Sequence, residues 1–331
     1  MRRLTTAILG IAFVVGGLYA FRLANPQKPL AAKPEAEVAP VVQEIVSSGD
    51  GNRFVIQTLE TVEDTMNLVA KVRQRVQIGE SELTGTGEYW QQAKGNLRRT
   101  RWSVQTLVAE GQGSYLQVFD GQTLWTDLHL PSKHEVTKLN LTDLRRQLAA
   151  SSAATTGGIS RTIQNLILTH RGGLTQLLDE LVQRFDFDQP QPMWWGDQSV
   201  YALIGHWKPG QVAKLWPDLK PTDPWPEALP HHVLLMVGKT DLLPYLIEYR
   251  SGSDATLAKA KNAFDMAPSP LTRYEFFDVQ IAQTIDPRLK LFVYEDSDAR
   301  AVDVTDQVFE RLVPPKAEPQ STVATHLQSQ R

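Results

Sequence analysis

Histidine and carboxylate side chains are the groups in this sequence that could bind a metal ion or transfer a proton. The chain has seven histidines, and none of them has the spacing of a metal site. His231 and His232 are adjacent in an expected strand, so their side chains point to opposite faces and cannot easily bind one ion together. Asp186 and Asp188 are the closest candidates for an acid–base pair, but a solvated helix end is the more common reason for such a pair. We predict no metal site and no cofactor.

Nucleophilic chemistry has little support in the sequence. The chain contains no cysteine, which excludes disulfides, thiolate catalysis and cysteine-ligated zinc. Ser151 and Ser152 lie in a stretch of small residues without a nearby base. There is no Gly-x-Ser-x-Gly elbow, phosphate-binding loop, dinucleotide fingerprint or His-Glu-x-x-His motif. We therefore predict a protein that is not an enzyme and has no catalytic residues.

The charge of the chain argues against nucleic acid as a partner. The formal net charge is −3, whereas nucleic-acid binding usually requires a basic surface. Three arginines, Arg98, Arg99 and Arg101, lie close together in the sequence just before Trp102. Strand alternation divides them between the two faces of the sheet. A solvated sheet edge is one interpretation of this basic run, and contact with anionic lipid headgroups is the other.

The N-terminus predicts export. Arg2-Arg3 precede an uncharged run, Leu4–Phe21, and Arg22 follows it. A basic flank before an apolar segment is typical of an export signal, and the length of this run fits either a signal peptide or an N-terminal membrane anchor. We assign 1–22 to these two alternatives, 23–42 to a flexible linker and 314–331 to a disordered tail. The expected location is the periplasm or cell envelope, with anchoring in the inner membrane as one possibility.

A hairpin in the middle of the chain is the clearest structural landmark. In Phe119-Asp-Gly-Gln-Thr-Leu-Trp125, Asp120-Gly121 separates two runs of alternating apolar residues, which predicts a two-residue turn. That turn would place Leu116 opposite Trp125 and Val118 opposite Thr123. The other face of the hairpin would carry Tyr115, Gln117, Phe119, Leu124 and Thr126.

Further strands and helices are expected around this hairpin. Apolar–polar alternation predicts strands at 70–78, 82–92, 96–108, 134–141, 199–206, 232–237, 242–250, 271–283 and 289–295, with Gly85 and Gly87 at a bend or bulge. Helical signals lie at 42–63, 144–150, 159–170, 174–185 and 212–215. No strand–helix–strand alternation is present, which excludes a doubly wound fold. We predict an α+β fold, in which a curved antiparallel sheet forms an unclosed β-barrel of about ten or eleven strands and helices cover its open side.

Short motifs in the chain occur in a familiar order. They are Gly85-x-Gly87, Arg101-Trp102, Asp120-Gly-x-Thr-Leu-Trp125, Glu135-Val136 and Val302-x-Val304-x-Asp306. This order resembles the outer-membrane lipoprotein carrier family, the LolA/LolB-like superfamily, closely over 70–141 and loosely over 273–306. The resemblance implies an unclosed antiparallel barrel, with helices across its open side, whose cavity holds the acyl chains of lipoproteins crossing the periplasm.

The chain departs from the family pattern in three ways. Carriers of the family have a basic residue near the end of the second strand that latches the helical lid, and alignment from Gly87 puts Ala93 at that position, with Lys94 next to it. The helical and Trp/Pro-rich segments at 142–230 are longer than a minimal carrier requires. A retained N-terminal anchor would tie down a protein meant to shuttle.

The resemblance leads to a prediction for the domain at 43–313. Strand parity assigns the lining of a hydrophobic hollow to Val72, Val76, Trp102, Val104, Leu116, Val118 and Trp125. The expected function is a monomeric, non-catalytic protein that binds acyl chains of a lipid or lipoprotein, contacts the membrane through its N-terminus and contributes to trafficking in the envelope. The alternative is a membrane-tethered interaction or scaffold module whose hollow is filled by its own side chains.

Overall fold

The computed structural model describes residues 50–313, except for 79–80, 109–110, 154–171, 217–218, 220–224, 227–228, 253–269, 282–283 and 296–299. Several expected segments therefore lie outside the described residues. They are the signal peptide or anchor at 1–22, the linker at 23–42, the helix at 159–170 and the tail at 314–331.

One large sheet organises the described part of the chain. Its strands are β1 (Asn67–Ile78), β2 (Ser81–Gln92), β3 (Arg99–Val108), β4 (Gly111–Phe119), β5 (Thr123–Leu130), β6 (Lys133–Asn140), β7 (Phe185–Phe187), β8 (Gln191–Trp195), β9 (Gln198–Trp207), β10 (His232–Gly238), β11 (Pro244–Arg250), β12 (Pro270–Ile281) and β13 (Val302–Asp303). Their order is β13-β6-β5-β4-β3-β2-β1-β12-β11-β10-β9-β7, and β8 also pairs with β9. The pairs are antiparallel, except that β13 runs parallel to β6. Within the described residues the two ends of this order do not meet, so the prediction of an unclosed antiparallel sheet is confirmed.

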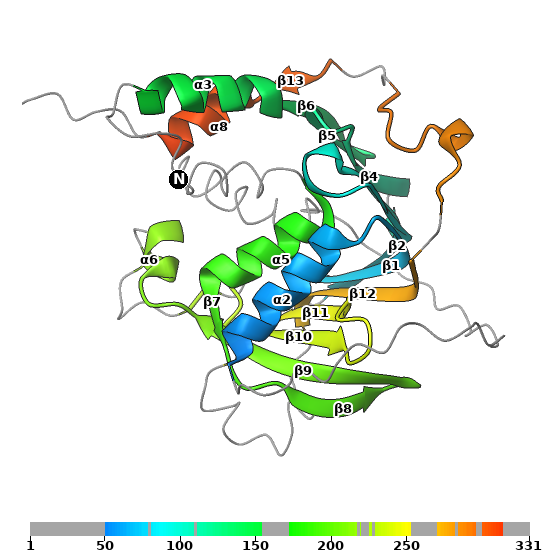
Figure 1. The fold of residues 1–331 in the computed structure, drawn as a ribbon, viewed down its shortest axis with the longest axis vertical. Helices are drawn as coiled ribbons and strands as arrows, with labels where there is room; N and C mark the ends of the chain where they lie inside the picture. Colours follow the sequence, from blue (N-terminus) through cyan, green and yellow to red (C-terminus); the bar gives the residue numbers. More distant parts are fainter. Residues whose placement is uncertain are drawn as a thin grey trace, which may run out of the picture.

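Helices lie on the concave side of the sheet. Five are described: α2 (Gly51–Asp64), α3 (Leu141–Ala153), α5 (Gly173–Arg184), α6 (Gln211–Leu215) and α8 (Thr305–Leu312). The Asp50 carboxylate begins α2 by accepting hydrogen bonds from the Asn52 and Arg53 amides. Figure 1 shows α2 and α5 side by side inside the curve of the sheet, whereas α3 and α8 lie together beyond β6. The α+β class with helices over the open side is thus confirmed.

Two apolar clusters fill the concave side. The larger one joins the inner face of β1–β3 and β9–β12 to buried residues of α2 and α5, among them Val55 and Val62 of α2 and Leu174, Leu178 and Leu181 of α5. The smaller one joins β4, β5 and β6 to α3, and α8 packs against it. α2, α3 and α5 each place one apolar stripe on the sheet, so burial of these stripes stabilises the helices.

Gly85 and Gly87 permit close approach of β2 and β3. A Cβ at Gly87 would lie 1.8 Å from the Ser103 carbonyl oxygen, and one at Gly85 would lie 2.6 Å from a methyl of Val104. The pairing of β2 with β1 and β3 runs through both glycines without a register shift. The expected bulge is therefore absent at these two residues, and they serve the tight curvature of the sheet instead.

The register of the central hairpin differs from the prediction. Val118 pairs with Trp125, Leu116 pairs with Asp127 and Phe119 pairs with Leu124. The predicted position of the turn was wrong. The Asp120 amide donates to the Thr123 carbonyl and its carboxylate accepts from the Gln122 and Thr123 amides, which centres the turn on Gly121-Gln122, one residue later than Asp120-Gly121. A shift of two residues keeps every side chain on its predicted face of the hairpin.

The segment after β12 is not the strand predicted at 289–295. Residues 286–295, which we call the strap, cross the convex face of the sheet. The Leu291 carbonyl accepts a hydrogen bond from Arg101 Nη1 at 3.2 Å, and the Tyr294 ring stacks on Trp125 at 4.8 Å. This segment is therefore held on a sheet face by one backbone carbonyl and one aromatic ring rather than by the predicted strand pairing.

Candidate binding face beneath two helices

The concave face of β1–β3 and β12 forms an aromatic and apolar floor beneath α2 and α5. Cross-strand pairs share a face, and on this face Val72 pairs with Gly87 and Phe276, and Tyr89 pairs with Trp102. Trp102 meets the rings of Tyr89, Tyr274 and Phe276 edge-on, at centroid distances of 5.9, 5.7 and 5.9 Å. This floor is continuous with the apolar stripes of the two helices.

The structure brings four of the seven predicted lining residues together. Val72, Val76, Trp102 and Val104 lie on the concave face and are buried. Leu116, Val118 and Trp125 lie on the convex face, because Trp102 pairs with Gln117 and Val104 pairs with Tyr115. The assignment of all seven residues to one face is corrected accordingly. The alternation of side chains predicts correctly which residues share a face within one hairpin. Both faces of β4 and β5 carry large apolar residues, however, so alternation alone could not show which of these faces continues the concave face of β3.

A buried arginine holds both helices to the floor. Arg98 follows the 3-10 turn η1 (Gly95–Leu97) and is 1% exposed. Its Nη1 donates to Thr175 Oγ1 of α5 at 3.0 Å, and its Nη2 donates to the Glu63 carbonyl of α2 at 2.8 Å. The Glu63 carboxylate lies 3.6 Å from Nη1. One guanidinium therefore donates hydrogen bonds both to a backbone carbonyl at the C-terminal end of α2 and to a hydroxyl in the first turn of α5.

Two glutamines extend this contact. Gln91, fully buried on β2, donates to the Val62 and Thr65 carbonyls at 2.7 and 2.9 Å, and accepts from the Tyr89 hydroxyl at 2.9 Å. Gln117 accepts from the Gly173 amide at 2.7 Å. We call Gln91, Arg98 and Gln117 the helix clamp. Gln91 and Gln117 come from strands and Arg98 from the turn before β3, and each side chain binds the end of a helix.

Two glycines shape the start of α5 against the clamp. Gly172 and Gly173 have φ values of 73° and 66°, a conformation that favours glycine. A Cβ at Gly172 would lie 2.6 Å from Gln117 Oε1, so the backbone must approach the glutamine closely. The first turn of α5 therefore depends on this glycine pair as much as on hydrogen bonds.

Arg98, rather than Ala93 at the aligned position, contacts the helices. Ala93 has a positive φ of 60° in the turn before η1 and carries no donor that could hold a helix. The solvated-edge interpretation was wrong for Arg98 and describes Arg99, which is exposed. No sequence signal separated these adjacent arginines, since only the path of the turn decides which of them points inward.

Acidic side chains meet at the contact between α2 and α5. Burial raises the pKa of Asp179 to about 7, and the charges of Glu180 and Glu63 add to that rise. Burial likewise raises the pKa of Glu180, which Arg184 partly opposes from 3.5 Å. Burial raises the pKa of Tyr89 to about 12, although the charge of Arg98 lowers it. The space beneath the helices thus disfavours negative charge.

The other candidates from the sequence lie elsewhere. Asp186 is exposed on β7 and accepts from Asn52 Nδ2, while Asp188 pairs with His206 at 3.3 Å. Neither carboxylate faces the floor. Within the described ranges, no three His, Asp or Glu side chains are grouped closely enough to hold a metal ion. In the same part of the chain, no helix has the length and apolarity needed to cross a bilayer.

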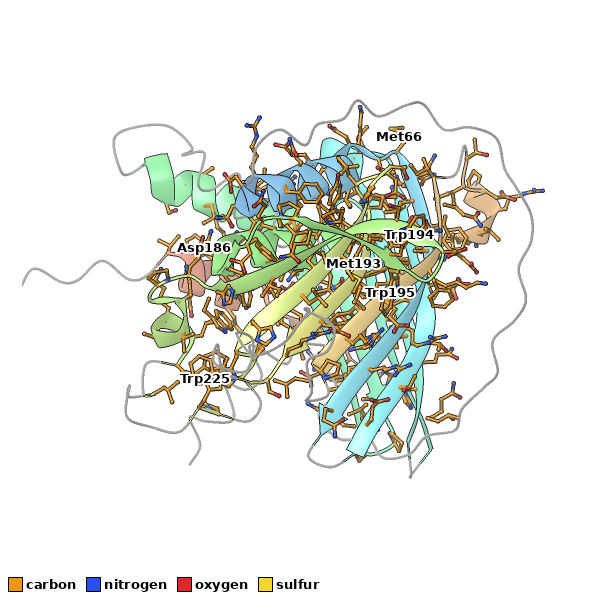
Figure 2. The ribbon with its side chains drawn as sticks, turned by 90° about the horizontal axis from the view of Figure 1, so that it is seen from below. Met66, Asp186, Met193, Trp194, Trp195 and Trp225 are labelled. Atoms are coloured by element: carbon orange, nitrogen blue, oxygen red, sulfur yellow. The ribbon has the colours of Figure 1, made fainter. Side chains whose placement is uncertain are left out.

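Aromatic residues on β8 form a feature that sequence reasoning missed. Figure 2 labels Met193, Trp194 and Trp195 along this strand. Trp195 covers the guanidinium of Arg273 at 5.1 Å on the convex face, and Trp194 is 70% exposed. Within the Trp/Pro-rich segment, Trp225 is tied down by a hydrogen bond of 2.7 Å to the Leu229 carbonyl.

A comparison with solved structures gives matches of low sequence identity, with TM-scores below 0.5. The chain is similar to the MucA/MucB complex structure of Pseudomonas aeruginosa, with 11% identity and a TM-score of 0.34, over 72% of this chain and 59% of that one. It is also similar to a putative outer membrane lipoprotein-sorting protein domain from Vibrio parahaemolyticus (11% identity, TM-score 0.29, 73% and 98% covered) and to a LolA superfamily protein from Nitrosomonas europaea (13% identity, TM-score 0.27, 72% and 97% covered).

The first of these matches spans less than two thirds of the MucB chain. No protein-family model and no curated protein matches the sequence.

Proposed function

We propose that this protein is a non-catalytic binding protein of the cell envelope, which takes up the acyl chain of a lipid or lipoprotein between the sheet floor and the α2–α5 pair. The helix clamp is the observation that carries the proposal. The side chains of Gln91, Arg98 and Gln117 bind helix ends over an apolar floor, and such contacts can be broken and remade together. The exported N-terminus, the trafficking role and the monomeric state are parts of the same proposal.

The energetics favour an apolar ligand beneath the helices. Buried residues of α2 and α5 cover Val72, Trp102 and Val104, and an acyl chain could replace these contacts when the helices move. Each buried methylene contributes about 0.8 kcal/mol, so a chain of ordinary length could offset the loss of the clamp's hydrogen bonds. Val72, Val76, Trp102 and Val104 remain the proposed lining. Leu116, Val118 and Trp125 do not belong to it, because they face the other way.

The second candidate is a membrane-tethered interaction module with a self-filled core. The observation that favours it is the packing of the floor, where Val72, Tyr89 and Trp102 are buried by the protein's own helices. A module of this kind would keep the clamp closed and would bind partners through its outer surface.

Arg98→Met tests the first candidate against the second. Methionine keeps much of the length of the side chain but removes its charge and donors, which should cost about 2–3 kcal/mol of stability and loosen both helices. We expect the full-length variant to take up a dansyl-labelled acyl chain several-fold faster than the wild-type protein, measured by stopped-flow fluorescence. Arg99→Met is the matched control, because Arg99 is adjacent and exposed, and it should behave as wild type.

One result of this experiment would favour the self-filled core over acyl binding. If neither the wild-type protein nor Arg98→Met binds the labelled chain while both remain folded by circular dichroism, the acyl-binding proposal is wrong. Organic extraction of the purified protein should then release no more lipid than a protein purified in parallel without a floor of this kind.

A further inference from the structure

Two histidines meet across the β5–β6 hairpin on the convex face of the sheet. His129 of β5 pairs with His134 of β6, and the centroids of their rings lie 4.7 Å apart. Residues directly opposite each other on antiparallel strands share a face. Linear spacing predicted no metal ligands here, because it is the strand pairing around the turn at Pro131-Ser132 that brings the two imidazoles together.

Each of these imidazoles has a nitrogen that could bind a metal ion. His134 Nε2 lies 2.9 Å from Asp127 Oδ1. A carboxylate accepts hydrogen bonds, so Nε2 carries the proton and Nδ1 keeps its lone pair. In the described part of the chain, His134 Nδ1 and both ring nitrogens of His129 make no hydrogen bond. His129 is exposed and its ring can turn, and two nitrogens on one tetrahedral zinc ion need to lie about 3.4 Å apart.

Asp127 supplies the outer partner that a metal-binding histidine usually has. Its side chain is 16% exposed. Histidine ligands commonly donate their other ring N–H to a carboxylate, which orients the ring and makes its free nitrogen a better ligand. The second oxygen of Asp127 accepts from the Tyr294 hydroxyl at 2.8 Å. A chain of contacts therefore runs from His134 through Asp127 to the strap.

A second pair of histidines lies opposite each other elsewhere in the sheet, and its surroundings are unsuited to a cation. His206 of β9 pairs with His232 of β10, and His206 also lies 3.3 Å from the Asp188 carboxylate. His232, however, is fully buried, and its partner on β11 is Arg250. Burial and a permanently charged guanidinium both oppose binding of a metal ion there. This pair thus provides a matched control.

We infer that His129 and His134 form a site for a late first-row transition-metal ion, Zn²⁺ or Cu²⁺, and that Asp127 couples this site to the strap. Imidazole nitrogens suit these ions, whereas Mg²⁺ prefers oxygen ligands. Two protein ligands leave the remaining coordination positions to water. The site lies on the face opposite the floor and does not depend on the proposed acyl binding.

The first test measures metal binding to the full-length protein at pH 7.5. We expect zinc chloride to bind in isothermal titration calorimetry, magnesium chloride not to bind, and one equivalent of Cu²⁺ to give an electron paramagnetic resonance spectrum with coupling to two nitrogens. Loss of an outer partner typically weakens metal binding by about 10–100-fold, and loss of a ligand should cost at least as much. His129→Asn and His134→Asn should therefore each weaken zinc binding by about ten-fold or more, whereas His206→Asn should bind as wild type.

Asp127→Asn separates the outer partner from the ligands. We expect this variant to keep the two-nitrogen copper spectrum but to bind zinc about ten-fold more weakly than the wild-type protein. The strap provides a second readout. Hydrogen exchange in residues 286–295, followed by mass spectrometry, should slow several-fold when zinc is added to the wild-type protein. Tyr294→Phe keeps the ring and removes the hydroxyl, so zinc should still bind to it without slowing this exchange.

The contrary results are distinct. Zinc binding that is the same in wild type, His129→Asn and His134→Asn, or a wild-type copper spectrum without two-nitrogen coupling, would show an adventitious ion only and overturn the site. Zinc binding at the pair without any change in strap exchange would overturn the coupling through Asp127. Neither result bears on acyl binding, which Arg98→Met tests separately.

Discussion

Asp179 on α5 shows how one side chain can couple the seating of the helices to pH. Its carboxylate accepts a hydrogen bond from Gln183 Nε2, yet burial and the neighbouring carboxylates raise its pKa to about 7 from 3.8. A group whose pKa is higher in the folded state than in the unfolded state stabilises the fold at low pH, and that contribution is lost as the pH rises through the folded value. The packing of α2 against α5 should therefore weaken between about pH 4 and pH 7.

Asp179→Asn isolates this effect. Asparagine can still accept from Gln183 but does not ionise, so we expect the variant to melt at nearly the wild-type temperature at pH 4 and several degrees higher at pH 8. Glu180 remains in both proteins, and its repulsion of the Asp179 carboxylate is part of the difference that the substitution removes. Thermal melts followed by circular dichroism across this range would test the assignment. A difference between the two proteins that does not change with pH would show that Asp179 ionises as freely in the folded protein as in the unfolded chain.

At the scale of elements, the contact between β2 and β3 determines how sharply the sheet can curve. Gly87 lies against the backbone of Ser103, whereas Gly85 lies against side chains of Val104 and Thr106. A side chain can move aside more easily than a paired strand, so the two glycines differ in what they tolerate. The sheet could not bring Tyr89 and Trp102 beneath the helices at this curvature without Gly87.

Gly87→Ala should accordingly be more harmful than Gly85→Ala. We expect losses of about 3 kcal/mol and about 1 kcal/mol in the free energy of unfolding, measured by urea denaturation. Thr86→Ala, at the exposed position between them, should change stability by less than about 0.5 kcal/mol. Similar losses for all three variants would contradict the close-approach argument.

At the scale of the whole molecule, the C-terminal region covers the β6 edge of the sheet. The strap crosses the convex face, where the Tyr294 hydroxyl donates to Asp127 at 2.8 Å. The chain then returns through β13 along β6, and α8 packs on α3 over Leu141, Leu144 and Leu148. A sheet edge and an apolar helix face are thereby covered together, which prevents the edge from pairing with other chains.

Truncation after Glu295 should expose both features. We expect the shortened protein to self-associate and to melt at a lower temperature, as measured by sedimentation velocity and differential scanning calorimetry. Truncation after Val313 is the control, because the described contacts of α8 end there, and it should leave both properties unchanged. Identical behaviour of the two truncated proteins would show that β13 and α8 are dispensable for covering β6 and α3.

Local patterning predicted most strands and four of the five described helices, because alternation and helical periodicity are properties of a few neighbouring residues. The strands β1 to β6 and the helix α5 follow their expected ranges to within a few residues. Short or irregular elements were missed. β7, β8 and α8 depend on neighbours far along the chain, and the strap at 286–295 contacts a sheet face through the Leu291 carbonyl and the Tyr294 ring.

The sequence by itself determined the fold class, the faces of the central hairpin and the residues that alternate on each strand. Only the tertiary structure decided that Arg98 rather than Ala93 or Arg99 holds the helices, and that Val72 and Trp102 face away from Leu116 and Trp125. The reason is physical. The alternation of side chains along one strand is a local property, whereas the alignment of one strand with the next depends on packing of the whole chain. The same is true of the contact between Arg98 and Thr175, which are 77 residues apart in the sequence.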